Sequence, residues 1–215
     1  MRFILTTLLA AISALGQGRS TPVENDQVRV LKVTQDAHKK TGLHKHDMNR
    51  VMIYLQPGKQ TIAYEDGKKV ELNWKAGQAL WSAKSGNHIA EIVSDGTVTI
   101  VEIELKKPGS GGNPATSKLD PVKIDKKHNM VEFENDQVRV VRVKIGGKDS
   151  VPMHEHSLNR VTTYISEEDF QVTGADGKTE HVIHKAGDVT WGTPLKHSAV
   201  NLSSKQTEML VVELK

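Results

Sequence analysis

Residues 23–33 of this chain, VENDQVRVLKV, return 110 positions later as FENDQVRVVRV at 133–143. The same shift aligns the tripeptides DGK at 66–68 and KAG at 75–77 with identical tripeptides in the second half. With one gap, the match continues to the EL(K) sequence that ends both copies, and it gives 27 identical positions. Self-similarity at one fixed spacing indicates a repeated structural unit. The sequence therefore predicts a tandem duplication, with two domains of the same fold.

Each copy has the pattern of a small β domain. Runs of β-branched residues such as VRVLKV and TVTIVEIEL are bounded by turn signals, and Asp-Gly pairs at 66–67 and 176–177 suit type I′ hairpin turns. Phe, Trp and Tyr number only three each, so Val, Ile and Leu must build most of the core. We expect an all-β protein with two jelly-roll or barrel domains, at 22–106 and 122–215, joined by a linker at 107–121 that is rich in Pro, Gly and Ser.

The first residues, MRFILTTLLAAISALG, have the pattern of a secretory signal peptide. One cation, Arg2, precedes an apolar run from Phe3 to Leu15, which is short for a helix that spans a bilayer. Small residues at the end of the run suit a cleavage site. We therefore expect a signal peptide at 1–16 and a secreted or periplasmic protein. An uncleaved membrane anchor or a buried strand is the alternative.

Composition excludes several functions. The 29 Lys and Arg nearly balance the 26 Asp and Glu, and the basic residues are scattered, so we expect no nucleic-acid partner. The absence of cysteine excludes disulfides, thiolate metal sites and a thiol nucleophile. We expect a small-molecule ligand as partner and no membrane contact after signal removal. Homo-oligomerisation is left open.

Two histidines separated by one residue occur at the same place in both copies, in GLHKHDMNRV at 42–51 and PMHEHSLNRV at 152–161. Residues i and i+2 of a strand face the same side, about 6.6 Å apart, so such a pair can converge on one metal ion. Two ligands hold a metal poorly, and the repeat places one more histidine in register in each copy. The candidate metal ligands are His44, His46 and His88 in the first copy and His154, His156 and His197 in the second.

This order of residues resembles the cupin superfamily, whose motifs run G-x5-H-x-H-x3,4-E and G-x5-P-x-G-x2-H-x3-N. The second copy follows its histidine pair with GDVTWGTPLKHSAVN, which contains Pro194, His197 and Asn201. The first copy has GQALWSAKSGNHIAEI, without the proline and with Ile92 in place of the asparagine. The resemblance covers almost all of 22–215 and implies a bicupin, with a histidine-bound divalent ion inside each barrel. The chain is more loosely similar to small bacterial cupins of the beta-alanine degradation type.

One departure from the motif concerns its glutamate, a metal ligand in the family. The corresponding positions are Arg50 or Val51 in the first copy and Arg160 or Val161 in the second, and neither residue type ligates a metal. We therefore expect three-histidine sites with open positions for water, dioxygen or substrate, for a divalent ion such as Fe, Mn, Zn, Ni or Cu. Three-histidine iron sites in cupins are associated with thiol dioxygenases. The second copy matches the motifs better.

The arginine beside each histidine pair has two interpretations. Facing inward, Arg50 or Arg160 would be repelled by a divalent cation unless an anion lay between them, which predicts a carboxylate or phosphate ligand. A shift of one residue turns a strand residue to the other face, and Val51 and Val161 would then line the pocket. We favour the outward orientation of the arginine.

Other residues also have alternative roles. Tyr54 and Tyr164 are either proton donors, as a tyrosine is in cupin-fold sugar epimerases, or parts of the core. Trp81 and Trp191 are core or pocket wall. The ENDQVRV string is expected to be a turn followed by a strand. Four histidines without a counterpart in the other copy are expected to be solvated: His38, His128, His181 and His184.

Three functions agree with these residues. The first is a metal-dependent oxidoreductase of the dioxygenase type that acts on a small organic acid or phenolic compound. Its candidate catalytic residues are Arg160, Tyr164, Arg50 and Tyr54. The second is a non-catalytic protein that binds a small ligand, and the third, less favoured, is a sugar isomerase or epimerase with a histidine as base and a tyrosine as acid. The fold alone does not choose among them.

Overall fold

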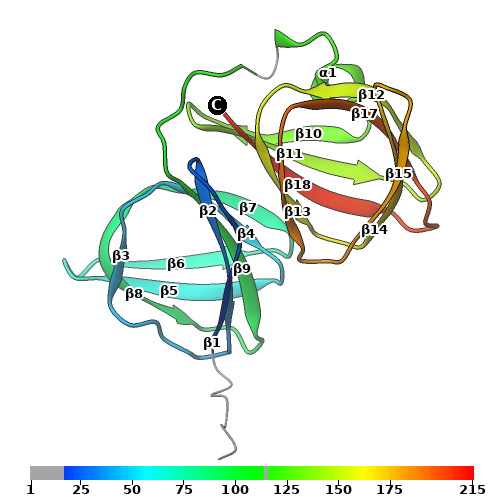
Figure 1. Ribbon diagram of the computed structural model, residues 1–215. Coiled ribbons are helices and arrows are strands. Elements are labelled where there is room, and N and C mark those ends of the chain that lie inside the picture. The colour runs from blue at the N-terminus through cyan, green and yellow to red at the C-terminus, as the bar shows by residue number, and fades with distance from the viewer. Residues whose placement is uncertain (1–16, 114–115) are drawn as a thin grey trace, which may run out of the picture.

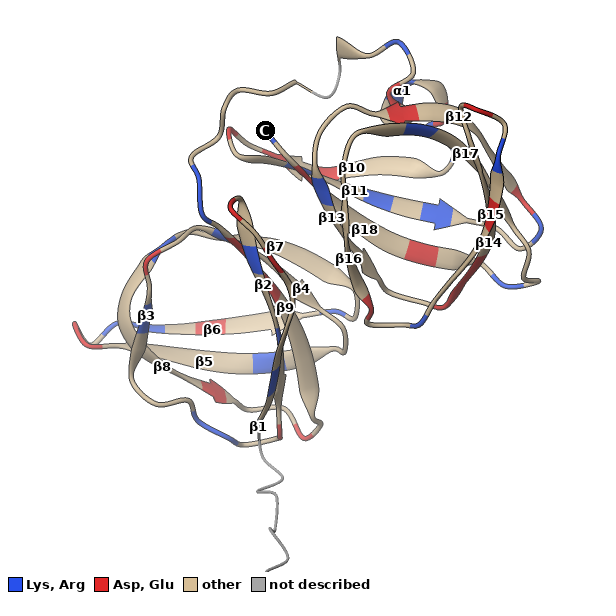
Figure 2. Cartoon of the chain, viewed as in Figure 1, with Lys and Arg blue, Asp and Glu red and all other residues tan. Residues whose placement is uncertain are grey.

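The computed structural model describes residues 17–113 and 116–215, and the expected signal peptide at 1–16 lies outside the described residues. The chain forms two all-β domains that lie next to each other, each built from a five-stranded and a four-stranded sheet (Figure 1). Lys and Arg are interspersed with Asp and Glu over the strands and loops of both domains (Figure 2). Within the described part of the chain, no helix is both long and apolar enough to span a membrane.

The N-terminal domain contains nine strands. They are β1 (Gln17–Glu24), β2 (Val28–Gln35), β3 (His44–His46), β4 (Arg50–Tyr54), β5 (Gly58–Tyr64), β6 (Lys69–Trp74), β7 (Gln78–Ser82), β8 (Ser85–Ile92) and β9 (Val98–Leu105). The large sheet has the order β1-β2-β9-β4-β7 and the small sheet the order β3-β8-β5-β6. Every pairing in the two sheets is antiparallel.

The C-terminal domain repeats this topology. Its elements are α1 (Pro121–Ile124), β10 (Asn129–Glu134), β11 (Val138–Ile145), β12 (Ser150–His156), β13 (Arg160–Tyr164), β14 (Glu168–Gly174), β15 (Thr179–His184), β16 (Val189–Gly192), β17 (Leu195–Asn201) and β18 (Thr207–Leu214). The sheet orders are β10-β11-β18-β13-β16 and β12-β17-β14-β15, which are the orders of the first domain shifted by nine strands. The prediction of two tandem jelly-roll domains is confirmed.

The Asp-Gly pairs form hairpins as expected, but with a different turn. Gly67 and Gly177 have φ values of 85° and 78°, whereas Asp66 and Asp176 do not have positive φ. A type I′ turn needs positive φ at both central residues, so that prediction is wrong. The nitrogen of Gly67 donates to the carbonyl of Tyr64 at 3.0 Å, which fits a longer hairpin loop whose left-handed residue is the glycine.

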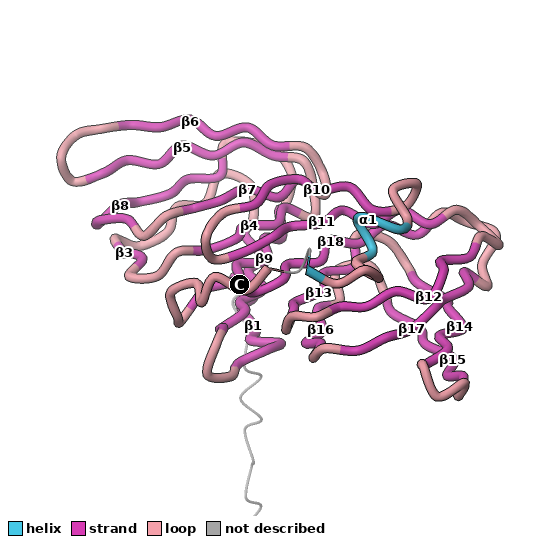
Figure 3. Tube along the Cα trace, turned by 90° about the horizontal axis from the view of Figure 1, so that it is seen from above, coloured by secondary structure: helices cyan, strands magenta, loops and turns pink. Residues whose placement is uncertain are grey.

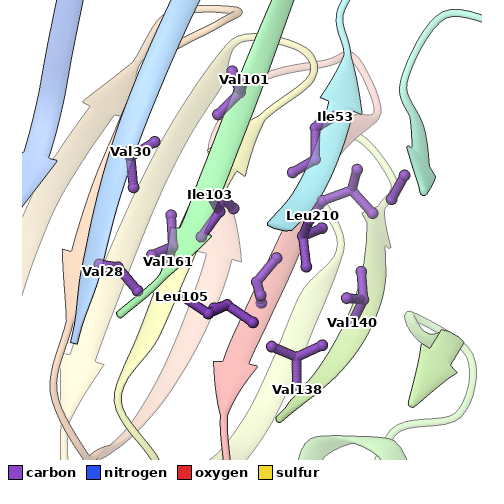
Figure 4. Close-up of a cluster of buried hydrophobic side chains, with 13 residues drawn as sticks. Val28, Val30, Ile53, Val101, Ile103, Leu105, Val138, Val140, Val161 and Leu210 are labelled. Atoms are coloured by element: carbon purple, nitrogen blue, oxygen red, sulfur yellow. The ribbon is translucent and has the colours of Figure 1, made fainter. Parts of the chain in front are cut away.

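The two large sheets share one hydrophobic core between the domains (Figure 4). Strands β2, β4 and β9 contribute from one side and β11, β13 and β18 from the other. Its members are Val28, Val30, Val51, Ile53, Ala79, Val101, Ile103, Leu105, Val138, Val140, Val161, Leu210 and Val212. Because alternate residues of a strand face opposite sides, each large sheet is buried on both faces, and all five residues of β4 and of β13 are buried.

Polar contacts around this core come in symmetric pairs. Asn49 donates to the side chain of Gln137, and its counterpart Asn159 donates to Gln27. The side chains of Lys32 and Arg142, which align in the repeat, donate to the carbonyls of Gly187 and Gly77, also aligned, each at 2.7 Å. Reciprocal contacts of this kind are those of a two-fold interface. The repeated ENDQVRV and KAG strings therefore serve the contact between the domains.

The segment between the domains packs against the second one. The nitrogen of Ser110 donates to the carbonyl of Lys215, and that of Glu155 donates to the carbonyl of Leu119. The short helix α1 follows and packs beside β12 (Figure 3). Residues 116–125 therefore cover the β12 edge of the C-terminal barrel.

Candidate metal centres and their cavities

The six predicted ligand histidines form two clusters, one inside each barrel. β3 and β8 are neighbours with His44 opposite His88, and β12 and β17 are neighbours with His154 opposite His197. In each set of three, ligand nitrogens lie within 4.8 Å of one another. The two sets are those expected from the sequence: His44, His46 and His88, and His154, His156 and His197.

Backbone carbonyls orient several of these imidazoles. Nδ1 of His44 lies 2.9 Å from the carbonyl of Gly42, and Nδ1 of His88 lies 2.8 Å from that of Gly86. In the C-terminal barrel, Nδ1 of His154 lies 2.9 Å from the Pro152 carbonyl. A carbonyl only accepts a hydrogen bond, so each Nδ1 carries the proton and Nε2 keeps its lone pair. This tautomer leaves Nε2 as the ligand atom.

Unsatisfied nitrogens mark the C-terminal cluster. Nε2 of His154 lies 3.2 Å from Nε2 of His156, and both ring nitrogens of His197 are buried without a hydrogen-bond partner among the described residues. A buried polar atom without a partner costs about 1–3 kcal/mol. A metal ion that accepts the lone pair of one nitrogen from each ring would remove part of this cost, so the donor set fits a divalent ion.

Burial favours the neutral form of the ligands. It lowers the pKa of His154 to about 4 and that of His197 to about 2, with the neighbouring histidines adding to the latter shift. In the N-terminal cluster, burial, followed by Arg50, lowers the pKa of His46 to about 3. The neutral imidazole is the form that binds a metal. Both clusters are therefore consistent with divalent metal sites.

Both arginines face the cavities, and the favoured outward orientation is wrong. Arg50 lines the N-terminal cavity of about 160 Å³, and Arg160 lines the C-terminal cavity of about 320 Å³. Their neighbours Val51 and Val161 are fully buried in the core between the domains. The outer face of this strand is covered by the other domain, so an arginine that faced outward would lie in an apolar core. The sequence of one copy does not reveal this contact.

The two arginines have different partners. Nη1 of Arg50 donates to Glu102 at 2.9 Å, and Nη2 donates to Ser82 at the same distance. Arg160 donates to the backbone carbonyl of Thr193 at 2.7 Å, and no carboxylate lies within ion-pair distance of it in the described part of the chain. In the repeat, Val211 stands at the position of Glu102. The first arginine forms an ion pair, whereas the carboxylate that acts on the second, Glu213, lies beyond ion-pair distance.

The two tyrosines also line the cavities, but the residues that stack on them differ. Tyr54 stacks on Trp74 with ring centroids 4.3 Å apart. Tyr164 stacks on His184 at 4.0 Å with an interplanar angle of 12°. Burial raises the pKa of both phenols, that of Tyr164 to about 12, so both keep their protons at neutral pH. Their role as proton donors stays a prediction.

The structure corrects two of the four histidines expected in solvent. His128 is buried, with Nδ1 at 2.8 Å from Asp125 and Nε2 at 3.1 Å from Asp149. His184 is half-buried against Tyr164. The remaining two, His38 and His181, form exposed pairs with aspartates. The expectation of solvent exposure was wrong for His128 and His184 because each has a partner in the folded domain that the sequence pattern of one copy does not predict.

Sequence analysis missed several carboxylates in or near the cavities. Glu102 and Glu168 line the N-terminal and C-terminal cavities. Glu213 is fully buried with one oxygen 3.6 Å from Nδ1 of His156 and the other accepting from Arg139 at 2.5 Å. Glu213 belongs to the repeated EL(K) end, which was a usable signal. Glu102 and Glu168 differ between the copies, so the comparison of identical positions passed over them.

Neither a protein-family model nor a curated protein sequence matches the chain significantly. Solved structures match it in fold. AerE from Microcystis aeruginosa aligns with 96% of this chain and 95% of its own at 11% identity, with a TM-score of 0.69. Oxalate decarboxylase from Bacillus subtilis aligns with 92% of this chain and 72% of its own at 13% identity and a TM-score of 0.62. A cupin 2 conserved barrel domain protein from Leptotrichia buccalis covers 96% of this chain and 93% of its own at 14% identity and 0.58.

The comparisons and the topology together define the fold. The chain has a two-domain, bicupin-like fold, with one three-histidine candidate metal site in each barrel. At these identities the likeness shows the fold and leaves the ligand to be argued from the residues.

Proposed function

We propose that the protein is a metal-dependent oxidoreductase that acts on a small organic acid in its C-terminal barrel. The carrying observation is Arg160, a buried guanidinium that lines the same cavity as three histidines and has no carboxylate partner among the described residues. Burying an unpaired charge is costly, and an anionic ligand would offset that cost. The reaction is of the dioxygenase type, in which both atoms of dioxygen enter the product.

The residues around the cavity have separable roles. Arg160 binds the carboxylate of the ligand, and Gly192 leaves space for its side chain, because a Cβ at Gly192 would lie 2.8 Å from the guanidinium carbon. Apolar residues such as Phe170 and Val211 also line the cavity. A divalent ion on His154, His156 and His197 would supply Lewis-acid and redox chemistry at its open positions. Tyr164 retains its proton and offers a hydrogen bond.

The N-terminal barrel supports a different role. Its cavity has half the volume of the other, and Glu102 already pairs with its arginine. We propose that this barrel holds a metal without an anionic ligand and that catalysis belongs to the C-terminal barrel. A non-catalytic binding protein is the alternative for the whole chain. Secretion is part of the proposal and rests on residues 1–16, and N-terminal sequencing of the protein from its native host tests it.

Metal content of the mature chain, residues 17–215, tests the first step. The protein would be purified without chelator or nickel resin and compared with His154→Ala and His44→Ala by plasma mass spectrometry. We expect one ion per barrel, and each variant should lose one of them. Manganese belongs in the reconstitution series with Fe, Zn, Ni and Cu because the similar oxalate decarboxylase has Mn(II) centres. Absence of stoichiometric metal after reconstitution would leave the ligand-binding alternative.

Oxygen consumption tests the second step. The loaded protein would be screened with small carboxylic acids and phenols in an oxygen electrode, with His154→Ala and Arg160→Gln as inactive controls. Turnover should survive in His44→Ala. Activity that depends on His44 and persists without His154 would overturn the assignment to the C-terminal barrel.

A further inference from the structure

A carboxylate lies in the wall of the C-terminal barrel. Glu168, the first residue of β14, is 6% exposed, and its Oε2 is buried without a hydrogen-bond partner in the described part of the chain. Glu168 lines the inner cavity that contains the three histidines. It also lines an outer hollow of about 590 Å³ on the surface of the domain. Glu168 therefore lines both spaces.

His184, the last residue of β15, is the neighbour of this carboxylate. Glu168 and His184 are opposite each other in the pairing of β14 and β15. Nδ1 of His184 lies at an ion-pair distance of 3.3 Å from Oε2 of Glu168, and neither atom makes a hydrogen bond in the described part of the chain. The imidazole side chain is 21% exposed. His184 lines the outer hollow but not the inner cavity. Because the ring stacks on Tyr164 at 4.0 Å, its orientation toward the carboxylate is fixed.

Charged groups lie on both sides of this pair. On the inner side, Arg160 and Tyr164 of β13 and Glu180 of β15 line the same cavity as Glu168. Asp188, before β16, acts on both Tyr164 and His184. The charged residues that line the outer hollow are Glu167, Asp169, Lys185 and Lys205. Burial raises the pKa of Glu168 to about 7 and lowers that of His184. The two shifts have opposite signs, so near neutral pH a protonated carboxyl group of Glu168 can lie beside a neutral imidazole of His184 that accepts its proton.

We propose that Glu168 and His184 form a proton-transfer pair that connects the C-terminal cavity with solvent. In the outward direction the carboxyl proton of Glu168 moves to Nδ1 of His184, and the proton on Nε2 of the resulting imidazolium passes to water in the outer hollow. Glu168 is left ionised and accepts the next proton from the cavity. The inward direction reverses each transfer. The use of this proton by a substrate rests on the proposed function, whereas the pair itself exists without a metal.

The N-terminal barrel lacks this pair and shows what replaces it. In the repeat, Gly58 stands at the position of Glu168 and Trp74 at that of His184. A Cβ at Gly58 would lie 2.6 Å from the Trp74 ring, so the indole fills the space of the carboxylate. The indole nitrogen donates to the Gln56 carbonyl at 2.9 Å, and no titratable side chain remains there. This substitution supplies a matched control.

Carbon-13 NMR of glutamate carboxyl groups in the metal-free mature chain tests the pair directly. The resonance lost in Glu168→Gln identifies Glu168. We expect it to titrate near neutral pH, and we expect its midpoint to change in His184→Phe, which keeps a ring on Tyr164. The histidine signals of His184 should in turn change in Glu168→Gln. A Glu168 carboxyl that titrates at an ordinary acidic pH, or is indifferent to His184→Phe, would overturn the proposal.

A second arm transfers the N-terminal arrangement to the C-terminal barrel. The double variant Glu168→Gly, His184→Trp should fold and bind metal like the parent chain, because the N-terminal barrel accommodates the same pair of residues. Once a substrate is identified, the change of kcat with pH near neutrality should be present in the parent chain and absent from the double variant. A profile identical to that of the parent chain counts against the pair. If no metal or turnover is found while the two titrations remain coupled, the oxidoreductase function fails and the proton-transfer pair stands.

Discussion

The two barrels have the same candidate ligands and different surroundings. Their histidine triads occupy equivalent strands, whereas the positions that face the ligand space have changed. Glu102 becomes Val211, and the pair Gly58 and Trp74 becomes Glu168 and His184. The first change removes the carboxylate that would pair with the cavity arginine. The second replaces a glycine and an indole ring with two titratable side chains. In this duplicated chain, the residues that hold a metal stay the same while those that would contact a substrate differ.

The barrels differ also in how their β3 and β12 edges are covered. Beside β3 lies an open groove of about 420 Å³ that includes His44, His46, Arg19 and Arg29. At the equivalent edge of the C-terminal barrel, Asp120 of the covering segment pairs with Arg139 at 2.8 Å. The open edge leaves His44 and His46 half-exposed, and the covered edge buries His154 and His156. The segment between the domains thus isolates one candidate site from water.

The largest expected effect of a substitution at these edges is on the free energy of unfolding. Arg139 is 2% exposed and pairs with Glu213 and Asp120, which are themselves 1% exposed. Arg139→Ala leaves two buried carboxylates without a partner, and we expect a loss of about 3–5 kcal/mol in the free energy of unfolding.

The control for this substitution is the aligned Arg29, whose side chain is 37% exposed and pairs with Glu104. Because Glu104 is itself 5% exposed, Arg29→Ala should cost about 1–3 kcal/mol, less than Arg139→Ala, which leaves two buried carboxylates. Urea unfolding followed by circular dichroism measures both. Equal losses in the two variants would show that the cover over the C-terminal barrel contributes nothing.

A somewhat smaller effect concerns the pH dependence of stability. The pKa of Glu168 is about 7 in the folded chain against 4.5 for an ordinary glutamate. Between these values the folded chain binds more protons than the unfolded chain, so the free energy of unfolding falls as pH rises from about 4.5 to 7. The total fall is up to about 3 kcal/mol. Glu168→Gln should remove it.

The measurement compares the variant with the parent chain by urea unfolding at pH 4.5 and pH 7.5. The difference between the two proteins reports Glu168 together with the coupled His184, because contributions of the other histidines are common to both. Glu167→Gln, at the exposed neighbouring position, is the control and should follow the parent chain. If the free energy of unfolding of Glu168→Gln changes with pH as that of the parent chain does, the raised pKa of Glu168 is contradicted.

Anion binding should separate the two arginines. Arg160→Gln removes the unpaired guanidinium, and a charge-assisted hydrogen bond is worth about 1.5–3 kcal/mol. We therefore expect the affinity of the metal-loaded protein for a small carboxylate such as oxalate or benzoate to fall about 10- to 100-fold. Isothermal titration calorimetry measures it. Arg50→Gln should leave the affinity unchanged, since Glu102 already occupies that arginine.

The reciprocal change sharpens this test. Val211→Glu introduces the N-terminal carboxylate beside Arg160 and should lower anion affinity without removing the arginine. Retained affinity in both Arg160→Gln and Val211→Glu would place the anion elsewhere.

The sequence predicted the fold and the ligand sets because the two copies of the duplication share both the strand pattern and the histidine positions. Identical residues at one spacing identified the triads, and strand alternation placed each pair on one face. The outward arginine failed for a physical reason: Val51 and Val161 lie in a core between the domains, and no pattern within one copy reveals that contact. Glu168 and His184 were not predicted for two reasons. They differ from the aligned Gly58 and Trp74, so a search for identical positions passes over them. Their contact also depends on a strand pairing that brings residues 16 positions apart in the sequence to 3.3 Å.

The smallest effect tests whether the symmetric contacts between the domains are equivalent. Asn159 donates to Gln27 at 2.7 Å, and Asn49 donates to Gln137 at 2.5 Å. Gln137 also donates to the carbonyl of Lys107 in the segment between the domains, a contact without a counterpart at Gln27 among the described residues. A neutral hydrogen bond contributes about 0.5–1.5 kcal/mol. We therefore expect Gln27→Ala to cost about 1 kcal/mol and Gln137→Ala about twice that, measured by thermal unfolding. Equal losses would mean that the shared hydrophobic core, and not the segment that joins the domains, sets their relative position.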